Sequence, residues 1–199
     1  GPSELPTVGP THGTQEGRSY HGYYAQHMYH PLRVIDGDTQ QLITALLRPG
    51  NAHASRGVIS VLRILVRAVR ARWPQVAIEV RADSGCAVPA IYAFCEREQL
   101  TYTIGLIPNP RLEQVPVPLL AQAQAQRATT GEKVRLVAET RYQAGSWDHE
   151  RRVVYKAEAL DEGPNTRFVV TTRTDEPAAL HAFYVDRGEA EHWLRVYKR

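Results

Sequence analysis

Four residues near the C-terminal end carry side chains that could do chemistry together: Tyr184, Arg187, Glu191 and Lys198. Their spacing places all four within an arc of roughly 60° on a continuous helix, because each residue advances an α-helix by about 100°. A phenol, a guanidinium, a carboxylate and an ammonium on one face suit contact with a phosphate backbone beside a metal ion. The alternative is a solvated helix face on which Arg187 and Glu191 form an ion pair worth only tenths of a kcal/mol.

A second carboxylate, Asp83, follows the β-branched segment 76–80 and stands directly before Ser84-Gly85. Open α/β sheets place ligands at the carboxyl ends of their strands. Together with Glu191, Asp83 suits a two-metal phosphoryl-transfer site, in which carboxylate oxygens and water hold Mg²⁺ or Mn²⁺. The alternative for Asp83 is a helix N-cap or a turn aspartate.

One tryptophan, Trp147, lies in a turn that the sequence Gly145-Ser146-Trp147-Asp148 predicts. An exposed indole at such a turn would stack on an unpaired base. The alternative is that Trp147 packs into a local core.

The elements that must position these residues follow a mixed α/β order. Apolar residues at the i, i+3, i+4, i+7 spacing predict the first helix, and Asp36-Gly37-Asp38 predicts a hairpin turn. The early strands should form an antiparallel meander, and the later ones, reached by crossovers, should be parallel. This order is that of a three-layer fold of the ribonuclease H type. The expected elements are strands at 21–36 and 40–47, a helix at 58–69, a strand suited to a buried position at 76–80, a helix at 89–99 and a strand at 101–106.

The second half of the chain changes pattern. A helix within 115–126 precedes three segments that favour strands, and Gly163-Pro164-Asn165 supplies turn chemistry. The last helical segment should begin near Asp175, a candidate N-cap, and Gly188 would break it. The expected strands are 133–143, 151–158 and 167–172. The expected division is a first part of the core at 1–110, a connecting helix and β insertion at 111–174, and a C-terminal helical part carrying Glu191 at 175–199.

Composition and charge exclude some classes of protein. The chain has 199 residues, 43% of them hydrophobic, without an apolar run near the length of a membrane span, so no membrane partner is expected. The polar start lacks the pattern of a signal peptide, and Cys86 and Cys95 favour buried thiols in a reduced cytoplasm. A net charge of +3 permits binding of nucleic acid without requiring it.

Several linked motifs carry a resemblance that runs from about Thr7 to Lys198. The chain resembles the catalytic domain of bacterial insertion-sequence transposases of the DDE class, in the subgroup with the Tyr-x2-Arg-x3-Glu-x6-Lys signature. Motifs in the right order are far more specific together than any one alone. The matching stretches are Thr11–Gly17, His21–Tyr24, Leu47–Asn51, Arg81–Gly85, Asn165–Val169, Arg187-Gly188 and the four signature residues Tyr184, Arg187, Glu191 and Lys198.

The resemblance implies a ribonuclease H-like fold with a β insertion before the helix that carries the glutamate. It also implies cleavage and strand transfer of double-stranded DNA at transposon ends, with Mg²⁺ or Mn²⁺, by a dimer assembled on DNA in the bacterial cytoplasm or nucleoid. Asp83 would be the second catalytic carboxylate and Glu191 the third, both as metal ligands. The residues expected to contact DNA are Tyr184, Arg187 and Lys198 at phosphates and Trp147 at a flipped base.

The chain departs from the family pattern at its first carboxylate. Leu5 occupies the position of the expected Asp, and Glu4 would face the other side of a strand. Cys86 also replaces the aromatic residue that usually follows Asp-Ser-Gly. We therefore expect impaired cleavage. One alternative is a transposase-derived domain that binds DNA without cutting it; another is a general nuclease, which the signature quartet disfavours.

Overall fold

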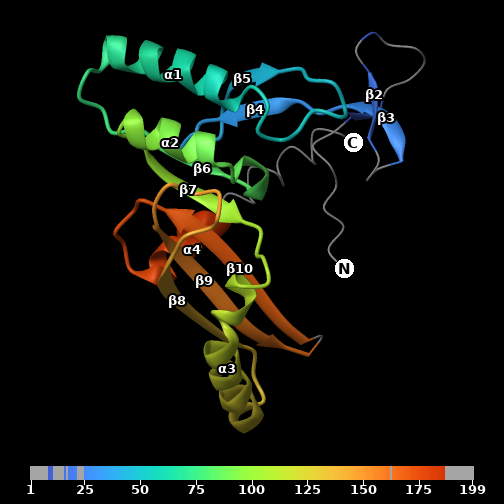
Figure 1. Ribbon diagram of the computed structural model, residues 1–199, viewed down its shortest axis with the longest axis vertical. Coiled ribbons are helices and arrows are strands. Elements are labelled where there is room, and N and C mark those ends of the chain that lie inside the picture. The colour runs from blue at the N-terminus through green and yellow to red at the C-terminus, as the bar shows by residue number, and fades with distance from the viewer. Residues whose placement is uncertain (1–8, 11–15, 17, 22–24, 162, 187–199) are drawn as a thin grey trace. The chain divides into compact units, whose positions relative to one another are not determined.

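The computed structural model describes residues 9–10, 16, 18–21, 25–161 and 163–186 (Figure 1). The chain divides into two compact units, one made of 1–63 with 186–199 and the other of 64–185. The three-part division expected from the sequence stays a prediction. In chain order the elements are β1 (Gly9–Pro10), β2 (Ser19–His21), β3 (Gln26–Tyr29), β4 (Leu32–Ile35), β5 (Leu42–Leu46), α1 (Val58–Arg72), β6 (Glu79–Ala82), η1 (Ser84–Cys86), α2 (Pro89–Arg97), β7 (Thr101–Leu106), η2 (Leu112–Gln114), α3 (Val117–Thr130), β8 (Val134–Tyr142), β9 (Arg151–Leu160), β10 (Gly163–Thr171) and α4 (Pro177–Val185).

The first unit contains two small antiparallel sheets, β1-β3-β2 and β4-β5. The predicted hairpin is confirmed: the Asp36 amide donates to the Gln41 carbonyl at 2.8 Å, and the Asp36 carboxylate accepts from the Thr39 amide at 2.7 Å. The single strand predicted over 21–36 is wrong, because that range holds the last residue of β2 and two separate short strands, β3 and β4. Ala25, with φ 50, adopts a left-handed conformation that interrupts an extended strand.

The Leu47–Asn51 stretch has a structural role in this unit. Arg48 is buried and donates to the carbonyls of His30 at 2.8 Å and Ala54 at 2.7 Å. A Cβ on Gly50 would lie 2.4 Å from the carbonyl oxygen of Met28, so no side chain fits there. The motif therefore holds the backbone of several loops together.

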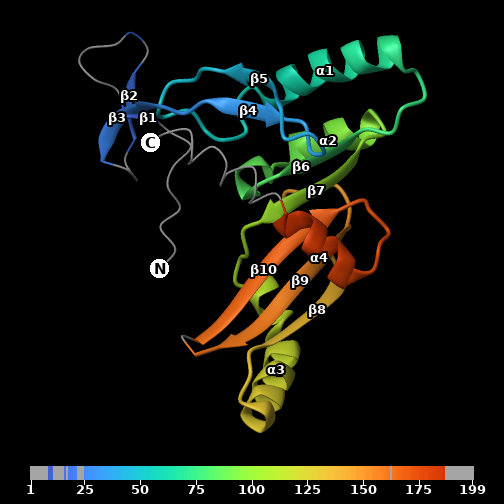
Figure 2. The same cartoon turned by 180° about the vertical axis from the view of Figure 1, so that it is seen from behind.

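The second unit is built on a five-stranded mixed sheet with the order β6-β7-β10-β9-β8 (Figure 2). β6 and β7 are parallel, as predicted, and the other pairs are antiparallel. The three strands predicted after residue 130 are confirmed as β8, β9 and β10, and they continue the sheet of β6 and β7 because β10 pairs with β7. The general prediction of a mixed α/β architecture is thus confirmed.

Two sequence predictions are wrong in this sheet. The strand expected at 76–80 is present but shifted to Glu79–Ala82, and its buried position is wrong: none of its residues is buried, and β7 is its only described neighbour. Gly163-Pro164-Asn165 is not the turn but the start of β10, opposite Glu158–Leu160. β9 ends at Leu160 and β10 already begins at Gly163, whose φ of 117 glycine tolerates.

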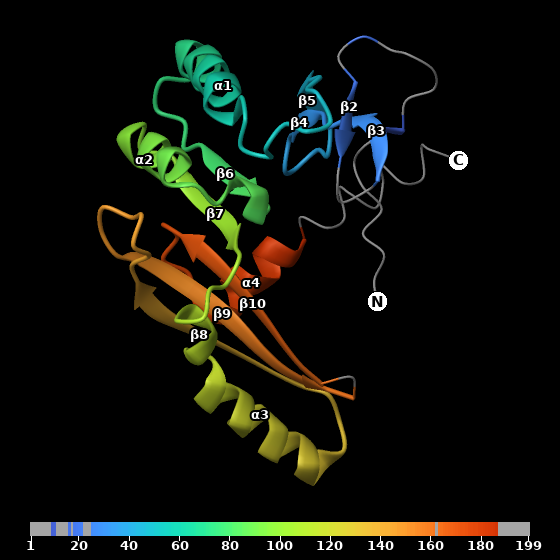
Figure 3. The same ribbon diagram turned by 45° about the vertical axis from the view of Figure 1, so that its right-hand side comes forward.

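Helices cover the two faces of the sheet. α3 packs against β8 and β9 on one side, and α4 packs against the same strands on the other (Figure 3). Val154 and Val169 of the sheet form a buried cluster with Leu180 and Tyr184 of α4. The helices predicted for α1, α2, α3 and the start of α4 are confirmed within a few residues. In the part of the chain that the structure covers, no helix is long and apolar enough to cross a membrane.

Candidate active site at the Asp83 loop

Asp83 is the first residue after β6, at the carboxyl end of that strand, as the sequence predicts. Its side chain is exposed, and its Oδ1 accepts a hydrogen bond from the Gly85 amide at 2.9 Å, which caps η1. The capping alternative is therefore correct, but it does not exclude a functional role. A carboxylate has about four acceptor positions, so one bond orients the group and leaves capacity for a ligand.

Tyr184 lies directly behind this loop. Its side chain is 5% exposed and belongs to the α4 core cluster. A Cβ built on Gly105 of β7 would lie 2.2 Å from the Tyr184 hydroxyl oxygen and 3.1 Å from the backbone nitrogen of Ser84. The Tyr184 phenol therefore occupies the space that a side chain at position 105 would fill, next to the backbone of the Asp83 loop. This gives Tyr184 a packing role, and the predicted contact with phosphate stays a prediction.

The end of α4 is tied to the edge strand by residues that the sequence analysis missed. Arg81 donates to the Phe183 carbonyl at 2.6 Å, and its guanidinium carbon lies 4.6 Å from the centre of the Phe183 ring. Arg173 stacks on the same ring at 4.3 Å and pairs with Glu79 at 2.6 Å. In the sequence, only the position of Arg81 within the Arg81–Gly85 motif could have indicated that this residue has a role at the site.

Asp175 is not the N-cap of α4. The helix begins at Pro177, which makes Glu176 the capping position, and the Glu176 carbonyl accepts from Leu180 at 3.0 Å. Asp175 instead pairs with Arg173 at 2.7 Å, and this pairing lowers the pKa of its carboxyl group. The Asp175 carboxylate is thus engaged by Arg173.

Trp147 is buried, with 6% of its surface exposed. It makes edge contacts with Tyr92 at 5.4 Å and Tyr142 at 5.7 Å, and the Arg151 guanidinium lies 5.4 Å from its ring. This arrangement is the core-packing alternative. Base stacking by Trp147 stays a prediction, and it would require the indole to leave this pocket.

The remaining predicted site residues, Leu5, Arg187, Glu191 and Lys198, lie outside the described residues. Of the four signature residues, Tyr184 alone has a described position, near the end of α4. Among the residues with a described position, no group of three His, Cys, Asp or Glu side chains could hold a metal ion. The pairing of Asp83 with Glu191 as metal ligands therefore stays a prediction.

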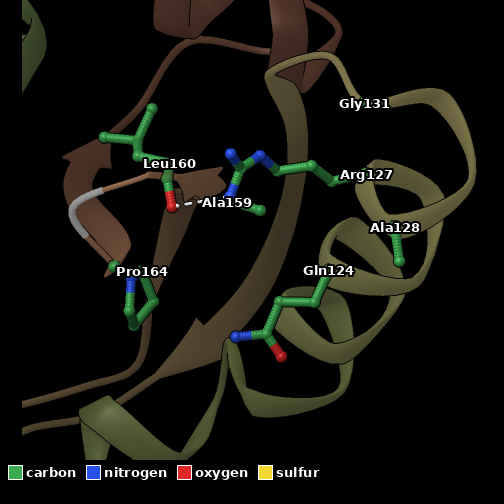
Figure 4. Close-up of a pocket in the computed structure, with 8 residues that line it drawn as sticks. Gln124, Arg127, Ala128, Gly131, Ala159, Leu160 and Pro164 are labelled. Carbon is green, nitrogen blue, oxygen red and sulfur yellow. Dashed lines mark hydrogen bonds between the residues drawn. The ribbon is translucent and has the colours of Figure 1, made fainter.

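A separate cavity of about 360 Å³ lies between the end of α3 and the β9–β10 turn (Figure 4). Arg127 points toward this turn and donates to the Leu160 carbonyl at 3.0 Å, and it also pairs with Asp161. Gln124 and Pro164 line the cavity, and no residue of the Asp83 loop does. The cavity is therefore not part of the candidate active site.

Residues 6–199 match the family model described as transposase DDE domain group 1. The match begins one residue after Leu5 and includes Asp83, Tyr184 and Glu191. A comparison with curated proteins finds no match to the chain.

Proposed function

This chain belongs to the group 1 family of transposase DDE domains, and from that premise we propose that it is the catalytic core of an insertion-sequence transposase. The proposed reaction is cleavage of DNA strands at transposon ends and their transfer into target DNA. The proposal includes the ribonuclease H-like fold, with β8–β10 as its insertion, and the Tyr-x2-Arg-x3-Glu-x6-Lys subgroup. It also includes action in the bacterial cytoplasm by a dimer on paired ends.

One observation carries this proposal: an exposed carboxylate at the carboxyl end of a sheet strand, within a matching family domain. Asp83 offers hard oxygen ligands of the type that Mg²⁺ and Mn²⁺ prefer, and the Gly85 amide already orients one of them. Asp83 and Glu191 would hold the metal. A bound ion would supply activation of the attacking oxygen and stabilisation of the leaving oxygen.

The chain's other residues would bind and orient DNA. Arg187 and Lys198 would contact phosphates of the transposon end. Tyr184, which precedes them in the chain, would contact a phosphate as well. Trp147 would stack on a flipped base after leaving its aromatic pocket. Burial of Tyr184 behind the Asp83 loop supports a further contribution, in which its ring fixes the position of that loop.

Leu5 should limit the reaction. A two-metal site that lacks one of three carboxylates should hold one of its ions weakly, so turnover should fall sharply. We therefore propose that the chain as it stands cleaves poorly. The alternative function is a transposase-derived protein that binds DNA without cutting it, and Leu5 is the residue that favours this alternative.

The test is Mn²⁺-dependent nicking of a plasmid that carries the element's ends, with the natural chain beside Leu5→Asp and Leu5→Asp/Asp83→Asn. If Leu5→Asp is the only one of the three proteins that cuts, the proposal is supported in full. If the unmodified chain also cuts, the proposed impairment is wrong, but the proposal that the protein is an enzyme stands. If none of the three cuts but all bind end DNA, the binding alternative replaces the enzyme; if none binds either, the proposed function is wrong.

A further inference from the structure

Four cations and one buried carboxylate lie on the face of the sheet against which α4 packs. They are Lys133, Arg135, Lys156 and Arg167 with Glu158, and we call the five residues the cationic face. Arg135 of β8 stands opposite Glu158 of β9, and Lys156 of β9 stands opposite Arg167 of β10. Because alternate residues of a strand share a face, Lys156 and Glu158 lie on the same side as Val154, which packs against α4.

Glu158 organises three of these cations. Its side chain is 2% exposed, and it accepts from Lys156 at 2.6 Å, Lys133 at 2.9 Å and Arg135 at 2.9 Å. Burial alone would raise the pKa of Glu158, but the hydrogen bonds from these cations outweigh it and lower the pKa to about 2. The carboxylate is therefore ionised at neutral pH and holds the surrounding groups in fixed positions.

One carboxylate cannot balance four cations. Burial lowers the pKa of Lys156, Glu158 raises it, and the charges of Arg167 and Arg135 lower it further, with a net decrease. Cations of this face also act on buried His181 of α4. Burial first, and then the charges of Lys156, Arg135 and Arg167, outweigh the charge of Glu158 and lower the pKa of His181 to about 4. The cluster thus keeps an excess of positive charge at an energetic cost, which a bound anion would relieve.

The cationic face is accessible. The strands run past α4 toward the β9–β10 turn (Figure 2). The side chains of Lys133 and Arg135 are 55% and 50% exposed, and Arg167 is also exposed. The opposite face of β9 carries Tyr155, Ala157 and Ala159 instead, so the charge is confined to one side.

We propose that the cationic face binds the phosphodiester backbone of duplex DNA, as a contact surface additional to the Asp83 site. The choice of DNA as occupant rests on the proposed function, whereas the need for a polyanion rests on the charges alone. Arg135 and Arg167 lie two strands apart, roughly 10 Å, and Lys133 and Arg135 lie two residues apart, roughly 7 Å. Cations spread over these distances match several phosphates of a backbone better than one small anion.

The chemistry of the face predicts binding that does not depend on DNA sequence. Guanidinium and ammonium groups contact phosphates and carry no sequence information by themselves. The described residues of the face are cations, one carboxylate and the amide of Asn165, which lies 3.4 Å from Glu158, and they include no aromatic ring for stacking on bases. Affinity should therefore fall steeply with salt.

The test measures binding of a short fluorescent DNA duplex of unrelated sequence by anisotropy, over a series of salt concentrations and in EDTA so that no cleavage occurs. The variant is Lys133→Gln/Arg135→Gln/Arg167→Gln. Its matched control is Arg67→Gln/Arg72→Gln/Arg97→Gln, which removes the same charge from exposed positions on α1 and α2. We expect the variant to lose about tenfold or more in affinity and its salt slope to fall by roughly 2 to 3, since each lost phosphate contact removes about 0.9.

Equal affinity and equal slope in the variant and its control would overturn the inference. Because the variant strips partners from buried Glu158, a second variant adds Glu158→Gln, and thermal unfolding verifies that both are folded. Arg167→Glu alone, outside the Glu158 hydrogen bonds, should weaken binding in the same direction. The two proposals fail in different ways. If the cationic face does not bind DNA, the triple variant binds the duplex like its control, and nicking by Leu5→Asp is unaffected. If the enzyme proposal is wrong, Leu5→Asp does not nick the plasmid, whatever the duplex-binding experiment shows.

Discussion

Strands β9 and β6 belong to one sheet but differ in almost every physical respect. β9 lies between β10 and β8, and eight of its ten residues are buried. β6 has four residues, none of them buried, pairs with β7 alone among the described strands, and leads into exposed Asp83. The buried charges near β9 are all held by close partners, whereas Asp83 makes one capping bond. The comparison separates charged side chains that stabilise the fold, which are buried and paired, from an exposed carboxylate that can still accept a ligand.

The largest expected effect comes from breaking an ion pair at the start of β9. Arg151 is 3% exposed and makes two bonds of 2.8 Å to the Glu96 carboxylate. Burial would raise the pKa of Glu96, but hydrogen bonds from Arg151 and Tyr102 outweigh it and lower the pKa. Glu96→Ala should cost about 3–5 kcal/mol of unfolding free energy, because it leaves a buried guanidinium without this partner. Urea unfolding measures the loss.

Asp148→Ala is the control for this pair. Asp148 also pairs with Arg151, at 3.0 Å, but its side chain is 68% exposed. Removing an exposed partner should cost at most about 1 kcal/mol. Equal losses in the two variants would contradict the view that burial around β9 decides the strength of its ion pairs.

The second effect is a pH dependence from His181. Its folded pKa of about 4 lies below the ordinary 6.5, so the unfolded chain binds the proton more tightly than the folded chain does. Stability should therefore fall as pH drops from about 6.5 to about 4, by about 3 kcal/mol, and then level off. His181→Phe should flatten this part of the stability curve, as measured by urea unfolding at a series of pH values. The same slope in both proteins would show that another group titrates.

The third effect concerns the contact behind the Asp83 loop. Gly105→Ala places a methyl group against the Tyr184 hydroxyl and should cost about 1–3 kcal/mol through overpacking. Adding Tyr184→Phe should restore part of this loss in a double-mutant cycle, since it removes the oxygen that collides. Gly145→Ala, where nothing lies within 4 Å, is the neutral control. Strictly additive losses at Gly105 and Tyr184 would mean that the two do not share this contact.

The smallest effect on stability should come from the candidate catalytic residue. Asp83→Asn keeps an acceptor oxygen for the Gly85 amide at an exposed position, so unfolding free energy should change by about 0.5 kcal/mol or less. Calorimetry or urea unfolding measures it beside Glu96→Ala. If Asp83→Asn lowers the unfolding free energy by more than about 1 kcal/mol, Asp83 stabilises the fold, and the proposed difference between Asp83 and the paired charges of β9 is wrong.

The sequence by itself determined most of the elements and the family. The apolar spacing of α1, the β-branched segments that become β7 and β9, and the hairpin at Asp36 all express local preferences that tertiary packing reinforces. The position of Asp83 directly after a strand also followed from the sequence. These features are readable because periodicity and turn chemistry act over a few neighbouring residues.

Only the tertiary structure decided where several side chains lie. From the sequence, Trp147 lies at a turn and should be available to DNA, but in the structure it packs against Tyr92 and Tyr142. Tyr184 is expected on the surface of a polar helix face, but it is buried against Gly105. The position of β6 at the end of the described sheet likewise depends on which strands pair with it, and among the described strands only β7 does. Burial and strand order arise from contacts between residues far apart in the chain, and local patterns do not encode them.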